Sequence, residues 1–246
     1  MKRVVKIAAC TILLILLLSS PSPSQMSLKL PPSKPHPLPP KLAQWETVAE
    51  VGDYFSEVEA TPLGYLVWSA FPVKVYLDLS AAKQKEDWEE AVETAIAEWN
   101  DYLPLQRVRD RAQANIIIAR SRPPINTVRN PETDRMEFSR ARSARTRYEF
   151  DLAENQLIHR MMIEISPDQA KVHTLATARH EIGHALGIWG HSPNAEDALY
   201  FSQVRDSPEI SDRDVNTLKK IYQQPTRLGW EIFIQQLPEF NRLRHP

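Results

Sequence analysis

Apolar and polar residues follow regular patterns through the middle of the chain, and these patterns predict an α+β domain. Phe71–Ser80 alternates in part and is rich in strand-forming residues, which predicts a first strand. From about Gln84 to Leu103, tryptophans and aliphatic residues recur at helical spacing opposite acidic residues, which predicts a long amphipathic helix packed on a sheet. Asn115–Ala119 is short, β-branched and apolar, which predicts a strand buried on both faces.

Three further elements complete the predicted order. Tyr148–Leu152 and Gln156–Ile165 predict two strands that turn at Asn155, and a second helix is expected from about Pro167 to Leu186. Ile210–Tyr222 predicts a closing helix, because it has a serine N-cap, aspartates in its first turn and lysines near its end. The expected fold is a twisted mixed β-sheet with a backing helix, a second helix and a C-terminal helix.

The first 24 residues have the pattern of a secretory signal peptide. Lys2, Arg3 and Lys6 precede an apolar run from Ile7 to Leu18, and serines and prolines follow it. Twelve apolar residues are too few for an ordinary membrane span. The protein is therefore expected to be secreted or periplasmic, with an uncleaved N-terminal anchor as the alternative, because no Ala-x-Ala site is present.

Composition divides the rest of the chain into three parts. Residues 25–44 are rich in proline and are expected to be a linker or short leader, while residues 45–224 suit one domain. Residues 225–246 are too apolar for a free tail and predict a short packed helix or a partner-binding appendix. Cys10 is the only cysteine and lies in the signal segment, so the mature chain has no disulfide. A net charge of −1 argues against nucleic acid as a partner, and a monomer is expected.

Arginines concentrate between Arg107 and Arg147. This stretch holds eleven arginines, no lysine and four acidic residues, so its local net charge is about +7. Such a run is usually a solvated surface. The alternative is a basic surface that favours acidic protein substrates or an anionic cell envelope.

The sequence His-Glu-Ile-Gly-His at residues 180–184 predicts a catalytic zinc site. Residues four apart on a helix lie on one face, so His180 and His184 can bind the same metal ion. Glu181 then lies beside the metal, where a carboxylate can take a proton from a metal-bound water. Glu181 is therefore the predicted general base.

A third ligand is expected from the residues that follow this helix. Gly187 can adopt the left-handed conformation that ends a helix, and Gly190 adds a second flexible point, so that His191 can turn back towards the metal. Glu196 and Asp197 are the alternatives, since carboxylates also bind zinc. The other histidines are scattered, and His159 and His173 are expected to be ordinary strand and helix residues.

Residues 180–191 resemble the signature of the metzincin metallopeptidases, most closely the matrixin branch. That signature is His-Glu-x-x-His-x-x-Gly-x-x-His, followed by a turn that contains methionine. Here His191 falls one residue late, and Leu199 occupies the position of the methionine, since no methionine follows Met162. Leucine for methionine conserves volume and is expected to be tolerated.

The resemblance extends over roughly residues 68–224 and implies a matrixin-like catalytic domain. Matrixins also carry a structural zinc and calcium ions, which the scattered remaining histidines make unexpected here. They are commonly held latent by a cysteine of the pro-segment. Because residues 25–44 have no cysteine and His36 is their only strong zinc ligand, the fourth zinc position is expected to be open to water.

These observations predict a secreted zinc-dependent endopeptidase that acts on protein or peptide substrates. Its cofactor is Zn²⁺, held by His180, His184 and His191, with Glu181 as the base. One alternative is a catalytically weak or inactive metzincin-like protein that binds the cell envelope. The other is a basic adhesion module with a structural zinc, which requires a fourth protein ligand.

Overall fold

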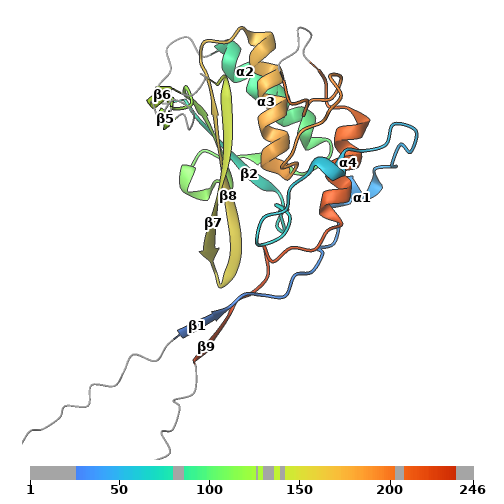
Figure 1. Ribbon diagram of the computed structural model, residues 1–246, viewed down its shortest axis with the longest axis vertical. Coiled ribbons are helices and arrows are strands. Elements are labelled where there is room, and N and C mark those ends of the chain that lie inside the picture. Colours follow the sequence, from blue (N-terminus) through green and yellow to red (C-terminus); the bar gives the residue numbers. More distant parts are fainter. Residues whose placement is uncertain are drawn as a thin grey trace, which may run out of the picture. The chain divides into compact units, whose positions relative to one another are not determined.

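A computed structural model describes residues 26–79, 86–125, 127–129, 136–138, 142–202 and 208–236 (Figure 1). Leu30–Phe233 form one compact unit. At the two ends of the described chain, strand β1 (Met26–Lys29) pairs with β9 (Phe233–Gln236) in a separate two-stranded sheet. The expected signal peptide lies outside the described residues. Within them, no helix has the length and hydropathy needed to cross a membrane.

The compact unit is built on a mixed five-stranded sheet, as predicted. Its strand order is β3-β2-β4-β8-β7, with all neighbours parallel except the antiparallel pair β7 and β8. The strands are β2 (Val73–Asp78), β3 (Leu105–Arg107), β4 (Ile116–Arg120), β7 (Ala144–Ala153) and β8 (Gln156–Ile165). Two short strands, β5 (Thr127–Arg129) and β6 (Met136–Phe138), form a separate antiparallel pair.

The helices confirm the predicted order. The long amphipathic helix is α2 (Glu86–Asn100), the second helix is α3 (Lys171–Leu186) and the closing helix is α4 (Asp212–Tyr222). Ser211 caps α4 through a capping box with Asp214. Three short helical segments are α1 (Pro40–Gln44), η1 (Phe55–Glu57) and η2 (Arg111–Gln113).

The sheet buries one face more completely than the other. Alternate residues of β2, β4 and β8 are buried, and the residues between them are mostly half-buried. The prediction that β4 is buried on both faces is therefore wrong, because Ile117 lies on the less covered face and is half-buried. The helices α2 and α3 pack on each other, and α3 also packs on β7 and β8. The sheet thus supports α3 from one side.

The strands β7 and β8 form the predicted hairpin, which Figure 1 shows as a long ribbon beside α3. Glu154 and Asn155 connect them, and both have positive φ, at 50° and 62°, as a two-residue hairpin turn requires. Strand β7 begins at Ala144, four residues before the predicted start at Tyr148. Its start is held by Arg145, which pairs with Glu164 of β8 at 2.6 Å.

The segment expected to be a linker or leader packs along the C-terminal segment. Backbone bonds of 3.0 Å join Lys34 and Thr226 in both directions, and the His36 ring stacks on Trp230 with centroids 4.2 Å apart. Leu42 is fully buried. Residues 223–236 form turns, isolated bridges and β9 instead of the short helix considered above, because Pro225 and the positive φ of Gly229 interrupt a helix.

Several arginines of the region 107–147 form ion pairs. These pairs are Arg107 with Glu93, Arg111 with Asp78, Arg122 with Asp168 and Arg145 with Glu164. These contacts neutralise part of the local positive charge. Binding of an anionic surface by this region stays a prediction.

Candidate metal centre

Two of the candidate ligands are fixed by helix α3 and by the way its C-terminus is held. His180 and His184 lie one turn apart on this helix. The indole Nε1 of Trp68 donates to the Ala185 carbonyl at 3.0 Å, and the Tyr222 hydroxyl donates to the Leu186 carbonyl at 2.9 Å. Because the last carbonyls of a helix have no partner within it, these two side chains hold the end of α3 in place.

Gly187 ends the helix as predicted, and only glycine fits there. Its φ is +127°, a value that other residues rarely adopt. A Cβ atom at this position would also lie 2.4 Å from the Leu66 carbonyl oxygen. The chain therefore turns sharply away from the helix axis directly after Leu186.

The extra residue before His191 is accommodated by a contact with an earlier segment. The Glu59 N–H donates to the Trp189 carbonyl at 2.9 Å. Gly190 lies so close to the segment around η1 that a Cβ atom would be 2.0 Å from the Glu57 carbonyl oxygen. The loop is thus held from outside, and His191 points back to the helix.

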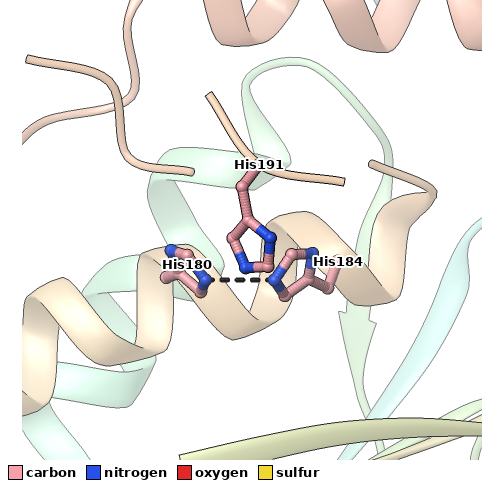
Figure 2. A group of neighbouring side chains, drawn as sticks. All are labelled: His180, His184 and His191. Atoms are coloured by element: carbon pink, nitrogen blue, oxygen red, sulfur yellow. Dashed lines mark hydrogen bonds between the residues drawn. The ribbon is translucent and has the colours of Figure 1, made fainter. Parts of the chain in front are cut away.

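The three imidazoles converge, as Figure 2 shows. His180, His184 and His191 each offer a ring nitrogen, and these nitrogens lie within 4.8 Å of one another. Nε2 of His180 and Nε2 of His184 are 3.0 Å apart. Two nitrogen ligands of a tetrahedral zinc are about 3.3 Å apart, so the separation of this pair is close to the one that zinc requires.

Hydrogen bonds determine which nitrogens are free to bind a metal. Nδ1 of His180 lies 2.9 Å from the Ala198 carbonyl oxygen, and Nδ1 of His184 lies 2.7 Å from the Ile188 carbonyl oxygen. A carbonyl oxygen only accepts, so each Nδ1 carries the proton. Burial lowers the pKa of both His180 and His184 to about 4, and it also lowers the pKa of His191. Near neutral pH, two Nε2 lone pairs therefore face each other, and a cation between them relieves the repulsion.

Glu181 follows His180 in helix α3, and its carboxylate is hydrogen-bonded to strand β7. Its side chain is largely buried, and the Thr146 hydroxyl of β7 donates to its Oε2 at 2.5 Å. Burial raises the pKa of the Glu181 carboxyl, while His180 and the bond from Thr146 act in the opposite direction. The contact with Thr146 could not be found from the sequence, because no spacing rule connects residues 146 and 181.

Leu199, which has the sequence position of the methionine in the metzincin signature, packs against helix α3. It is fully buried, and its Cδ2 is 2.6 Å from where a Cβ of Gly183 would be. Glycine at position 183 therefore lets α3 approach Leu199 closely. The preceding carbonyl, of Ala198, is the one that receives the Nδ1 proton of His180. This turn thus orients the His180 ring as well as supporting the helix.

The two acidic alternatives to His191 do not join the cluster. Asp197 is buried and accepts hydrogen bonds from Ser192, Ser211 and Arg213. Glu196 is exposed, and the group among the described residues that could hold a metal ion consists of the three histidines.

The remaining described histidines lie in other surroundings. His159 of β8 is buried and stacks on Trp68 with centroids 3.9 Å apart. His173 is exposed in the first turn of α3. Nε2 of His36 lies 2.8 Å from the Leu228 carbonyl oxygen. This nitrogen therefore makes a hydrogen bond to the C-terminal segment.

A cavity of about 300 Å³ opens beside His191. Besides this histidine, it is lined by Glu57, Glu59, Gly190, Ser192, Pro193 and Phe201. The Phe201 side chain is 64% exposed, which is high for an aromatic residue. The metal centre therefore borders a space that can hold a side chain of another molecule.

Comparison with protein families agrees with this geometry. The model of the matrixin family matches residues 71–223, which is more than half of the chain and includes the sheet, both long helices and the histidine cluster. The chain belongs to the matrixin family. A search among curated proteins found no match. The matrixin match supports a metallopeptidase domain and confirms the predicted α+β fold class.

Proposed function

We propose that this matrixin domain is a zinc-dependent endopeptidase. The observation that carries the proposal is the pair of Nε2 atoms of His180 and His184, which lie 3.0 Å apart with both Nδ1 protons committed to backbone carbonyls. Neutral imidazoles in this arrangement favour a bound cation. Three nitrogen ligands with an open fourth position are typical of catalytic zinc.

The proposed roles follow from the residues around that position. His180, His184 and His191 hold the zinc, which supplies a Lewis acid and lowers the pKa of water when bound. Glu181 takes the proton of the attacking water and later passes it to the leaving amine. Its carboxylate is largely buried and the Thr146 hydroxyl holds Oε2, so the proposal assigns this exchange to Oε1.

An extended peptide is the substrate that the surroundings favour. The strand β7 is the last in the five-stranded sheet, so one of its edges has no partner strand within that sheet. Exposed strand edges bind extended peptides through backbone hydrogen bonds. The cavity beside His191 then offers room for a substrate side chain close to the proposed reaction centre.

We also propose that the enzyme acts outside the cytoplasm and needs no activating cleavage. The first part rests on the signal-peptide pattern of residues 1–24. The second is supported by His36, whose Nε2 contacts the Leu228 carbonyl and whose ring stacks on Trp230. No side chain of residues 30–44 belongs to the histidine cluster.

The test is zinc content measured together with cleavage of an unstructured protein. We expect about one zinc per chain and cleavage that stops with a chelator and returns with zinc. Glu181→Gln should keep the zinc while losing roughly two to four orders of magnitude in kcat, because only the general base is removed. A chain that binds zinc but cleaves nothing would instead support the inactive envelope-binding alternative, and an equally active Glu181→Gln would contradict the proposed mechanism.

A further inference from the structure

The Thr146 side chain makes a contact that the proposed mechanism leaves unused. Its hydroxyl lies 2.5 Å from Oε2 of Glu181 and 3.2 Å from the backbone oxygen of the same residue. A hydroxyl has one proton, and the shorter distance assigns it to the carboxylate. The Thr146 hydroxyl therefore donates to the Glu181 side chain, and a hydrogen bond from the Thr146 backbone also lowers the pKa of this carboxyl.

The sheet fixes the position of this hydroxyl independently of the helix. Thr146 is opposite Ile163 in the β7–β8 register, and Ile163 is fully buried. The adjacent Arg145 pairs with Glu164 across the same two strands through two bonds of 2.6 and 3.0 Å. Threonine is also restricted at χ1 because it is β-branched. The hydroxyl is therefore held rigidly relative to α3.

The consequence is that two elements determine the direction of the Glu181 carboxylate. The helix α3 sets the position of its Cα, and β7 holds one carboxylate oxygen. With Oε2 held, Oε1 is the oxygen left to exchange a proton with water. Without the bond, the side chain of a glutamate has several rotamers, and most of them do not direct an oxygen to the metal centre.

We propose that Thr146 is a positioning residue that orients Glu181 for proton transfer. The inference rests on the proposed function of Glu181 as the general base. A positioning role differs from a purely structural link between β7 and α3. If Thr146 positions Glu181, its loss slows the chemical step only when Glu181 is present.

The decisive variants are Thr146→Val, which keeps the shape and removes the hydroxyl, and Thr146→Ser, which keeps the hydroxyl. Measured with the zinc-loaded full chain and one peptide, Thr146→Val should lower kcat roughly 10- to 100-fold, as a misplaced catalytic group does. KM and zinc content should stay near the wild-type values, and Thr146→Ser should retain most of the activity. Thr177→Val is the matched control, because its hydroxyl on α3 bonds to Gln169 and should not affect kcat.

A double-mutant comparison separates positioning from general damage to the fold. In the Glu181→Gln background, Thr146→Val should cause no further loss, since there is no base left to position. Equal slowing in both backgrounds, or an unchanged kcat in Thr146→Val, would overturn the proposal. If Thr146→Val does not fold, Thr146→Ala takes its place in every comparison.

A measurement without turnover completes the test. The ¹³C resonance of the Glu181 carboxyl carbon, identified by its loss in Glu181→Gln, should move in Thr146→Val and keep its position in Thr146→Ser. An identical resonance in wild type, Thr146→Val and Thr146→Ser would show that the Thr146 hydroxyl does not bond to Glu181. Active wild-type enzyme with a normal Thr146→Val refutes only the role of Thr146, whereas wild-type protein without zinc-dependent cleavage refutes both this role and the proposed function.

Discussion

The metal centre and the surroundings of His159 both contain buried histidines, yet only one of them has the features of a metal site. Burial lowers the pKa of His159 to about 3, in the same direction as for His180 and His184. In the metal centre, each Nδ1 of the two helical histidines has a carbonyl partner and the Nε2 atoms converge. At His159, by contrast, Nε2 has no hydrogen-bond partner among the residues that the structure describes, and the ring stacks on Trp68. Burial and a lowered pKa alone therefore do not identify a ligand, whereas convergence with oriented protons does.

The largest expected difference between the two regions is in zinc affinity. His191→Ala should weaken zinc binding at least 100-fold, because one of the ligands in a site worth on the order of 12 kcal/mol contributes about 3 kcal/mol. His159→Phe should leave zinc binding unchanged. Competition with a chromophoric chelator measures both. Retained affinity in His191→Ala would give the third position to a carboxylate such as Glu196.

A smaller loss is expected when the loop that carries His191 is displaced without removing any ligand. Gly190→Ala places a methyl group against the Glu57 carbonyl, and we expect zinc affinity to fall roughly 10-fold or more, as for other supporting contacts. Gly52→Ala is the control, because Gly52 has a φ of +69° and open space around it, so alanine strains the backbone without displacing a neighbouring atom. Both variants should melt earlier, and only Gly190→Ala should bind zinc more weakly. Equal zinc affinities of the two variants would show that the contact between Gly190 and Glu57 does not position His191.

His159 should affect the pH dependence of folding stability and not the affinity for zinc. Its pKa is about 3 in the folded protein and about 6.5 in the unfolded chain, so between these values only the unfolded chain binds the proton. Stability should therefore fall as pH decreases below about 6.5, by up to about 1.4 kcal/mol per pH unit from this residue, with no contribution above that range.

Urea unfolding of metal-free protein at several pH values measures this slope. The three histidines of the candidate metal centre also contribute, so the relevant quantity is the difference in slope between wild type and His159→Phe. Parallel slopes for the two proteins would mean that His159 is protonated in the folded state.

The smallest effect is expected at the floor of the metal centre. Leu199→Met restores the residue typical of the family, and volume-conserving changes in a core usually cost less than about 1.5 kcal/mol. Zinc affinity and kcat should stay within about twofold of wild type. Thermal unfolding and the peptide assay check this, and a large gain in activity would show that leucine limits the enzyme.

The sequence predicts those parts of the centre that depend on local geometry. His180, Glu181 and His184 follow from helical periodicity, and Gly187 follows from the conformation that ends a helix. The β7–β8 hairpin and the cap of α4 were predictable for the same reason. Each of these signals lies within a few residues of the feature that it predicts.

Contacts between distant segments were not predictable. Thr146 meets Glu181 across 35 residues, and Trp68 meets Ala185 across 117. The degree of burial of Ile117 also depends on what covers the outer face of the sheet, which the apolar run itself does not encode. Such contacts arise from the tertiary arrangement.

The hydrogen bond between Glu59 and Trp189 shows that the candidate metal centre depends on residues that precede the region matched by the family. Residues 57–59 hold the loop before His191, yet the family match begins only at residue 71. A recombinant chain that starts at Phe71 would contain the entire motif and every candidate ligand, but it would lack the segment that compensates for the extra loop residue. Anyone who trims this protein to its recognisable domain should therefore obtain a chain with a correct signature and a misplaced third histidine.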